Sequence, residues 1–171
     1  KKDLSLNILD LGTGSGIIGI TLARNFKKSE ILMTDLSVNA IEVAKKNIDA
    51  SGLKNIKCLQ SNWFEKIDHS MFDIIVSNPP YIPKNDPHLE SPELKYQPQM
   101  ALTADDDGFS DIDNITFHAQ KFLKKSGILL IEHGYNQARK VQEIFNRNKL
   151  SGITQFTDIN NTIRATLGSK I

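Results

Sequence analysis

The most unusual stretch of the sequence is SNPPY, residues 77–81, which directly follows an apolar run. Proline fixes φ, lacks an N–H and forces the residue before it into an extended conformation, so Asn78 and Pro79 are both held extended. Pro79 and Pro80 have no donor, and this length of backbone therefore offers mainly carbonyl oxygens. The result is a rigid corner that begins with the Asn78 amide and ends with the Tyr81 ring. Such a corner suits a planar group that carries N–H donors, such as an amide or a nucleobase amine.

A second chemical motif is the glycine-rich stretch DLGTGSG, residues 10–16, at the end of another apolar run. Glycines let the backbone turn sharply and approach a ligand closely, and the helix behind such a loop presents free N–H groups. A later apolar run ends at Asp35, roughly 20 residues after the glycines, where a carboxylate can accept both hydroxyls of a ribose. The two features together predict a site for an adenosine-containing cofactor.

Both NAD and S-adenosylmethionine carry an adenosine, and the spacing of Gly14, Gly16 and Gly19 also fits the dinucleotide fingerprint. The remainder of the ligand must distinguish the two. An NAD loop should cradle a pyrophosphate, whereas this loop opens with Asp10, a carboxylate better suited to a cationic amino group. S-adenosylmethionine, whose sulfur is a sulfonium, is therefore favoured over NAD, although the loop by itself fits either cofactor.

The elements that must position these motifs alternate between strands and helices. Apolar runs predict strands at Asn7–Leu11, Glu30–Asp35, Ile56–Gln60, Phe72–Ser77, 127–132, 153–157 and 162–167. Helical spacing predicts helices over 17–26 and 38–51, and Ser37 can cap the second. It predicts two further helices, whose apolar faces are formed by Ile112, Ile115, Ala119, Phe122 and Leu123 in one and by Val141, Ile144 and Phe145 in the other. The alternation predicts an α/β fold with a mostly parallel, doubly wound sheet covered on both faces, closed by an antiparallel hairpin.

One connection is much longer than the others. All six prolines lie between Pro79 and Pro98, and roughly 28 residues separate the strand ending at Ser77 from the next helix. Connections of this length in compact domains are usually functional or disordered. This one begins at the proline corner, at the carboxyl end of a strand, where open α/β sheets bind ligands. We expect it to be a substrate-facing loop.

The composition is that of a globular protein, with 171 residues, 39% hydrophobic and 24% charged. This length predicts one domain over residues 1–171. The net charge of +1 lacks the basic excess of nucleic-acid-binding domains. Cys58 is the only cysteine, which excludes an internal disulfide and favours a cytoplasmic location, and no apolar run is long enough for a membrane span. Because a core strand begins within a few residues of Lys1, we expect that a further segment precedes it.

Taken together, the motifs resemble those of class I methyltransferases that act on planar nitrogens, and most closely the release-factor glutamine methyltransferases (the HemK/PrmC family). The resemblance covers nearly the whole chain through the segments DLGTGSG, SNWF, SNPPYI, YQPQMAL, DDDGF and DINNTIR. Two departures stand out. Gln97 stands where the family usually has a glutamate, and the family's amino-terminal helical domain, which helps to grip the release factor, is absent from this chain.

The resemblance implies a Rossmann-like fold with seven strands and the transfer of a methyl group from S-adenosylmethionine to a glutamine side-chain nitrogen of a peptide-chain release factor. The implied cofactor-binding residues are Asp10, Gly12, Thr13, Gly14, Ser15, Gly16, Asp35, Trp63 and Asn78. The implied catalytic residues are Asn78, Pro79 and Tyr81, and Pro80 joins them in binding the substrate. No metal is expected, and the enzyme is expected to be a cytoplasmic monomer whose partner is the release factor.

Three other functions fit part of the sequence. An N-methyltransferase acting on an exocyclic amine of a DNA or RNA base would use the same corner, but it must extrude a base and hold a phosphate backbone. A cofactor sensor without catalysis would need the glycine loop and not the corner. An NAD-dependent dehydrogenase would leave residues 76–81 unexplained.

Overall fold

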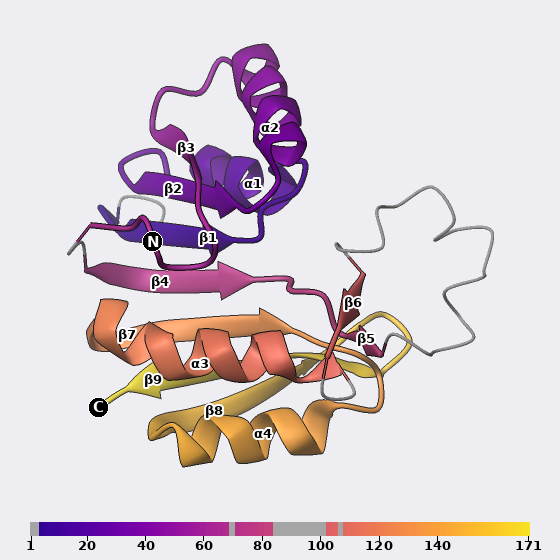
Figure 1. Ribbon diagram of the computed structural model, residues 1–171. Coiled ribbons are helices and arrows are strands. Elements are labelled where there is room, and N and C mark those ends of the chain that lie inside the picture. The colour runs from indigo at the N-terminus through magenta and orange to yellow at the C-terminus, as the bar shows by residue number, and fades with distance from the viewer. Residues whose placement is uncertain (1–3, 69–70, 84–101, 106–107) are drawn as a thin grey trace.

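The computed structural model describes residues 4–68, 71–83, 102–105 and 108–171. Its main sheet has seven strands in the order β3-β2-β1-β4-β7-β9-β8 (Figure 1). These strands are β1 (Asn7–Leu11), β2 (Glu30–Asp35), β3 (Ile56–Gln60), β4 (Phe72–Ser77), β7 (Leu123–Glu132), β8 (Leu150–Thr157) and β9 (Ile163–Lys170). The helices are α1 (Ile17–Asn25), α2 (Val38–Ser51), α3 (Ser110–Phe122) and α4 (Ala138–Arg147).

The topology confirms the predicted doubly wound sheet. β3, β2, β1, β4 and β7 are parallel, whereas β9 is antiparallel to both β7 and β8. The chain winds outward in one direction from β1 to β2 and β3, then returns to the other side of β1 as β4. The point between β1 and β4 is therefore the topological switch point, where open α/β sheets bind ligands beyond the carboxyl ends of their strands.

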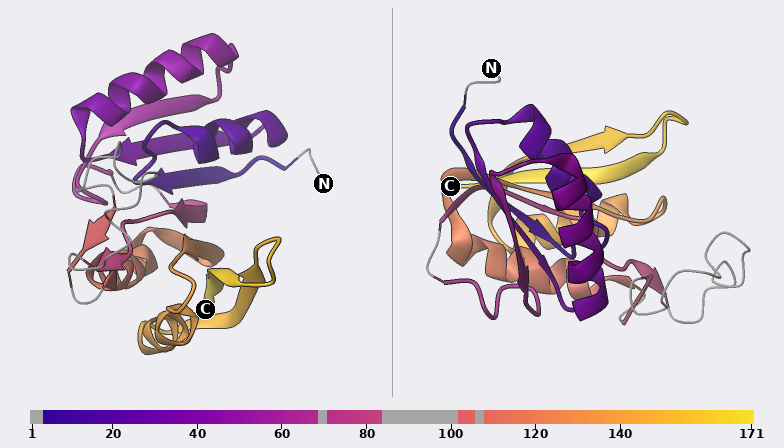
Figure 2. Two further views of the ribbon diagram at one scale, coloured as in Figure 1. Left: turned by 90° about the vertical axis from the view of Figure 1, so that its right-hand side faces the viewer. Right: turned by 90° about the horizontal axis from the view of Figure 1, so that it is seen from above.

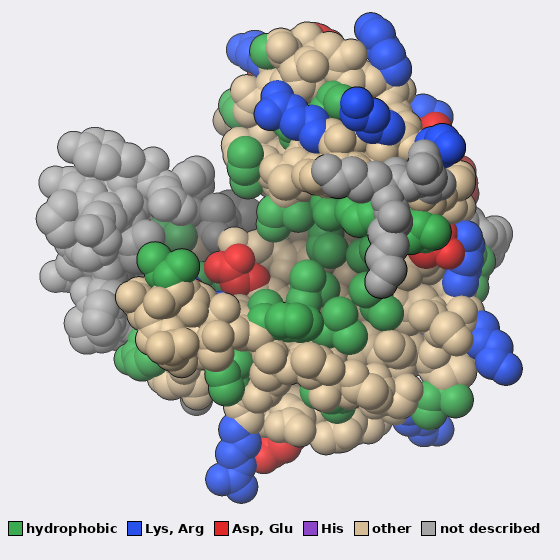
Figure 3. All heavy atoms as spheres, turned by 180° about the vertical axis from the view of Figure 1, so that it is seen from behind, with side chains coloured by type: hydrophobic (Ala, Val, Ile, Leu, Met, Phe, Trp, Pro, Cys, Tyr) green, Lys and Arg blue, Asp and Glu red, His purple; other side chains and the backbone are tan. Residues whose placement is uncertain are grey.

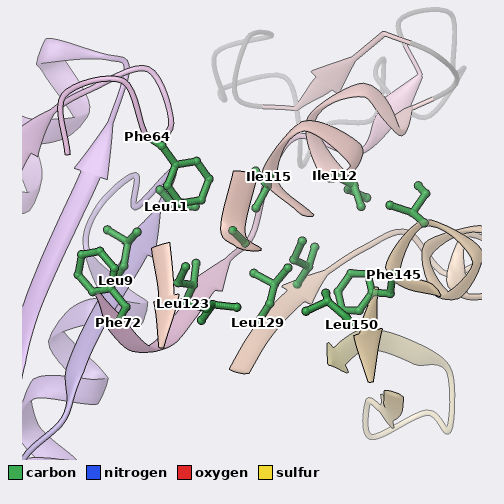
Figure 4. Close-up of a cluster of buried hydrophobic side chains, with 14 of the residues drawn as sticks. Leu9, Leu11, Phe64, Phe72, Ile112, Ile115, Leu123, Leu129, Phe145 and Leu150 are labelled. Atoms are coloured by element: carbon green, nitrogen blue, oxygen red, sulfur yellow. The ribbon is translucent and has the colours of Figure 1, made fainter. Parts of the chain in front are cut away.

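The sheet separates two hydrophobic cores. Leu9 and Leu11 of β1 belong to one core and Ile8 to the other, because successive residues of a strand point to opposite faces. The larger core joins β1, β4 and β7 to α3 and α4 and contains Phe72, Leu129 and Phe145, among other residues (Figure 4). The smaller core lies between β1–β3 and the helices α1 and α2, on the opposite side of the sheet (Figure 2).

Helices cover each half of the sheet on one face only, so the expected double coverage is incomplete in the described residues. Over β7 and β9, the face away from α3 and α4 carries the cross-strand pair Leu130 and Leu167, both half-buried. Figure 3 shows this side of the molecule, with hydrophobic side chains gathered over its middle and several Lys and Arg side chains around the α1–α2 part above. No helix in the described ranges combines the length and apolar character needed to cross a membrane.

Local signals set the ends of α2 as predicted. The Ser37 hydroxyl accepts a hydrogen bond from the Ala40 N–H at 3.3 Å, which caps the amino end. Gly52 ends the helix with φ +69°, a left-handed conformation that favours glycine.

The structure departs from the prediction at the start of β7 and at a short strand pair that was not predicted. β7 begins at Leu123, four residues before the predicted start, so Leu123 belongs to the strand and not to the preceding helix. Lys124, Lys125 and Ser126 carry no apolar alternation, and the pairing of Leu123 with Phe72 extends the strand over them. The short parallel pair β5 (Ile82–Pro83) and β6 (Thr103–Ala104) was not predicted, because neither two-residue strand carries a sequence pattern.

Candidate active site

The glycine loop and the proline corner leave the sheet side by side. Leu11 of β1 lies opposite Ser77 of β4 in the parallel ladder, and the Ser77 hydroxyl donates to the Leu11 carbonyl at 2.9 Å. Gly12 directly follows β1, and Asn78 directly follows β4. The two motifs that sequence analysis identified separately therefore meet at the switch point of the sheet.

The three glycines of the loop have positive φ values, but their surroundings differ. Gly14 has φ +55°, and a Cβ placed on it would meet nothing within 4 Å, so this part of the loop borders open space. A Cβ on Gly12 would lie 3.3 Å from the Trp63 ring. A Cβ on Gly16 would lie 3.2 Å from the Met33 methyl group, so Gly16 packs into the smaller core. Of the three, Gly14 is the one placed for close approach by a ligand.

Asp10 holds the loop together from inside the protein. It is fully buried, and one carboxylate oxygen accepts from the Thr13 hydroxyl at 2.6 Å and from the Gly19 N–H at 2.9 Å. Its other oxygen is buried and has no hydrogen-bond partner among the described residues. Burial raises the pKa of Asp10 to about 6, against the hydrogen bonds from Thr13 and Gly19, and the negative charge of Asp35 adds to the increase. Asp10 is therefore placed to attract a cation through its charge, while its hydrogen bonds are made to Thr13 and Gly19 inside the protein.

The raised pKa of Asp10 predicts a pH dependence of stability. The ordinary aspartate pKa is 3.8, so between about pH 4 and 6 the folded state binds more protons than the unfolded state. The free energy of unfolding should therefore fall as the pH rises through this window. Between pH 4.5 and 7.5 the loss from this group should be about 2 kcal/mol, measured by urea unfolding.

The control for this prediction is Asp10→Asn, which keeps an oxygen for Thr13 and Gly19 but does not titrate. The stability of the wild type relative to Asp10→Asn should decline over the window. Parallel stability profiles for the two proteins would show that Asp10 titrates elsewhere.

Asp35 lies where β2 ends, between the glycine loop and α2. One carboxylate oxygen accepts from the Gly14 N–H at 2.9 Å and the other from the Ser37 N–H at 2.8 Å. Each oxygen has a further lone pair, and the side chain is half-exposed, so the carboxylate can still accept hydroxyl groups from a ligand. Ser15 is exposed at the tip of the loop, and its carbonyl accepts from the Asn47 amide at 2.8 Å.

Trp63 connects the glycine loop to the entrance of α3. Its ring lies against Gly12, it packs on the larger core, and its indole partly offsets the increase that burial causes in the pKa of Asp111. Its backbone adopts φ +44°, uncommon for a bulky residue. The indole thus borders the loop, and its role in binding the cofactor remains a prediction.

The corner itself is exposed at one end and anchored at the other. Asn78 is exposed, and its amide makes no hydrogen bond within the described residues. Pro79 is buried behind it. At the far end, the Tyr81 carbonyl accepts from the Gln137 amide at 2.9 Å, and the Tyr81 hydroxyl accepts from Arg164 at 3.2 Å. Asn78 is therefore free to meet a ligand while the backbone that carries it is fixed.

Sequence analysis did not identify the residues that anchor the corner. Glu132, Gln137 and Arg164 all contact Tyr81, and Gly108 packs directly against its carbonyl. No short motif joins them to Tyr81, since Arg164 lies 83 residues away. The only available signal was the arginine in DINNTIR, at the turn of the closing hairpin.

Gly108 offers a direct test of this packing. It has φ +87°, and a Cβ there would collide with the Tyr81 carbonyl and lie 2.8 Å from the Gln137 amide nitrogen. Gly108→Ala should lower the free energy of unfolding by about 3 kcal/mol, from left-handed strain and overpacking together. The matched control is Gly52→Ala, with φ +69° but nothing within 4 Å of its Cβ, which should lose only about 1 kcal/mol. Equal losses in urea unfolding would contradict the close approach.

Some predicted features lie outside the described residues. These are Gln97, most of the substrate-facing connection including all of YQPQMA, and the second and third aspartates of DDDGF. Their predicted roles remain predictions.

Comparison with known proteins gives the same reading as the motifs. The chain is 41% identical over 166 residues to the "Release factor glutamine methyltransferase" of Francisella tularensis, covering 97% of this chain and 58% of that protein. It is 38% identical to the protein of the same name from Escherichia coli K12, covering 94% of this chain and 58% of that one. The chain thus spans somewhat more than half the length of these relatives.

The fold is also found in solved structures. A guanine-N2 methyltransferase of 16S ribosomal RNA from Thermus thermophilus, solved with AdoMet and guanosine, aligns with a TM-score of 0.71 at 20% identity, over 99% of this chain and 38% of that one. The class I methyltransferase fold predicted from the sequence is confirmed. Residues 1–91 match the family described as "Methyltransferase small domain". The match covers more than half of the 171 residues, and the chain belongs to the methyltransferase small domain family.

Proposed function

We propose that this chain is the catalytic domain, residues 1–171, of a release-factor glutamine methyltransferase, which transfers a methyl group from S-adenosylmethionine to the side-chain nitrogen of a glutamine. The observation that carries the proposal is the pairing of Leu11 with Ser77, which sets the glycine loop beside the proline corner. The names of the relatives, at 38–41% identity over nearly the whole chain, support the glutamine substrate.

The residues of the loop fit S-adenosylmethionine. Gly14 borders open space, and the half-exposed Asp35 carboxylate next to it has acceptor capacity for the ribose hydroxyls. Asp10 places a negative charge under the loop, with one oxygen still unpartnered, which suits a ligand with a cationic amino group and a sulfonium. The negatively charged pyrophosphate of NAD would instead be repelled by the carboxylates of Asp10 and Asp35. When bound, the cofactor supplies an electrophilic methyl group.

The corner supplies the catalytic effect. A glutamine side-chain nitrogen is a poor nucleophile, because its lone pair is delocalised into the carbonyl. The Asn78 side-chain oxygen and the Pro79 carbonyl accept its two N–H bonds, which orients the nitrogen and raises its electron density. The same oxygens stabilise the positive charge that the nitrogen gains as the methyl carbon passes to it from the sulfonium sulfur. The nitrogen then loses one of its two N–H protons to solvent. This is electrostatic preorganisation, and it requires no metal and no covalent enzyme intermediate.

The ring of Tyr81 completes the substrate site in this proposal. It packs against the planar amide, together with Pro80, and limits the approach to the geometry of attack. In this proposal the enzyme is a cytoplasmic monomer whose partner is a protein. The single cysteine supports the cytoplasmic location, and the net charge of +1 argues against a nucleic-acid partner.

Transfer of radiolabelled methyl groups tests the proposal. The natural protein that contains residues 1–171 is supplied with labelled S-adenosylmethionine and with either a release factor, ribosomal RNA, transfer RNA or DNA. Label should enter the release factor alone, and it should be lost when the acceptor glutamine is replaced by alanine. Label in a nucleic acid would favour the alternative, methylation of an exocyclic base amine, for which the same corner would serve.

A further inference from the structure

Two charged side chains from the carboxyl edge of the sheet hold the Tyr81 phenol. Arg164 donates from its guanidinium to the Tyr81 hydroxyl at 3.2 Å, with its central carbon 5.7 Å from the ring centroid. The Glu132 carboxylate lies beside the same hydroxyl, where its negative charge raises the pKa of the phenol. Glu132 ends β7 opposite Ala165 of β9, and Arg164 is the neighbour of Ala165, so the sheet itself brings the pair together.

The direction of each hydrogen bond follows from the groups involved. Arginine has only donors, so the phenol oxygen accepts from Arg164, and the phenol O–H is left to donate to the Glu132 carboxylate. Burial raises the pKa of Tyr81, and the negative charge of Glu132 adds to the increase, so the phenol keeps its proton at neutral pH. The Tyr81 hydroxyl thus interacts with both Arg164 and Glu132. Tyr81 can offer a substrate only its ring.

The Tyr81 backbone is held as firmly as its side chain. Gln137 donates to the Tyr81 carbonyl at 2.9 Å, and its amide oxygen accepts from the Gly134 N–H at 2.8 Å. At the other end of the corner, Ser77 is bonded to Leu11. The backbone that carries Asn78 and the Pro79 carbonyl is therefore held at both ends. Ser77 holds one end to β1, and Tyr81 holds the other to the β7–β9 pair.

We propose that Glu132 and Arg164 are positioning residues, which act through Tyr81 to fix the acceptor oxygens of the corner and do not touch the substrate. The inference rests on the proposed function. Its physical basis is that displacing a reacting group by about 1 Å can cost about 100-fold in rate. A hydroxyl held by two charged partners restrains the ring more than either partner would alone, since charge-assisted bonds are about twice as strong as neutral ones.

A double-mutant cycle tests whether Glu132 acts through Tyr81, and a single variant tests Arg164. Glu132→Ala, Arg164→Met and Tyr81→Phe should each lower kcat by about 10- to 100-fold, while KM and the affinity for S-adenosylhomocysteine stay within about twofold. In the Tyr81→Phe protein, the hydroxyl is already missing, so Glu132→Ala should cost nothing further. Glu132→Gln keeps an acceptor for the phenol and should restore most of the activity lost in Glu132→Ala. Glu143→Ala, which removes an exposed acid on α4, should leave kcat unchanged.

Two kinetic results would overturn the proposal. One is an undiminished effect of Glu132→Ala in the Tyr81→Phe protein, which would mean that Glu132 acts independently of Tyr81. The other is a change confined to KM, which would mean that Glu132 or Arg164 contacts the substrate. If Glu132→Ala does not fold, Glu132→Gln replaces it in the cycle, with a smaller expected loss and the same required non-additivity.

A readout without substrate separates this proposal from the proposed function. The chain has three tyrosines, so ring-labelled 13C-tyrosine gives few signals, and Tyr81→Phe identifies that of Tyr81. Glu132→Ala and Arg164→Met should both shift the Tyr81 ring signals and leave those of the exposed Tyr135 in place. Unchanged Tyr81 signals would overturn the positioning role. Failure of the wild type to methylate a release factor would instead overturn the proposed function, whatever the ring signals show.

Discussion

Asn78→Ala is expected to lower kcat for methyl transfer by about 100- to 1000-fold, the usual effect of removing one preorganised polar group from a reacting centre. Asn78 is exposed at the end of β4, and the structure shows no hydrogen bond from its amide to other described residues, so its loss should not disturb the fold. The affinity for S-adenosylhomocysteine, measured by calorimetry, should change by less than about fivefold, because the loop and Asp35 supply most of that binding.

The control for this variant is Asn146→Ala, an exposed asparagine on α4. It removes the same amide at the opposite edge of the sheet and should leave kcat unchanged. Full activity in Asn78→Ala would remove the acceptor role of the corner. A loss of cofactor affinity as large as the loss of kcat would move Asn78 from catalysis to cofactor binding.

The second large effect is expected at Asp35. Asp35→Asn removes the charge and one acceptor oxygen beside Gly14, and two charge-assisted hydrogen bonds to ribose hydroxyls weaken together. The dissociation constant of S-adenosylhomocysteine should rise roughly 100-fold, at about 1.5 kcal/mol for each bond. Isothermal titration calorimetry measures this change directly.

A matched control is available on the same helix that Asp35 precedes. Asp49→Asn makes the same substitution at an exposed position near the end of α2 and should change the dissociation constant by less than about twofold. NAD should give no measurable heat with either protein. Tight NAD binding to the wild type, or unchanged S-adenosylhomocysteine binding by Asp35→Asn, would contradict the assignment of this cofactor site.

Much of the fold could be predicted because its signals are local. The first four strands are found at their predicted bounds, and Ser37 and Gly52 mark the ends of α2 as helix-capping rules require. The errors occur where tertiary pairing overrides local pattern. β7 extends back to Leu123 because Phe72 pairs with it, and the hairpin strands extend beyond their predicted ends because β8 and β9 pair with each other to Leu150 and Lys170.

The motifs of the site could be predicted from the sequence, but the residues that hold these motifs in place could not. Gly14, Asp35 and Asn78 lie at the same edge of the sheet because the parallel ladders align Leu11 with both Thr34 and Ser77. Asp10 was predicted as a cofactor-binding residue, which stays a prediction; its complete burial and its hydrogen bonds to Thr13 and to the Gly19 N–H of α1 could not be predicted from the local sequence. The contacts of Tyr81 with Glu132 and Arg164 depend on the order of β7 and β9 in the sheet, which no local pattern specifies.

The most direct test is a crystal structure of the protein with S-adenosylhomocysteine and a glutamine-containing peptide from a release factor. The glutamine amide nitrogen should lie within hydrogen-bonding distance, about 3 Å, of both the Asn78 side-chain oxygen and the Pro79 carbonyl, and it should face the cofactor sulfur. An amide bound elsewhere, with this pair of oxygens turned toward solvent or toward other protein groups, would contradict the account.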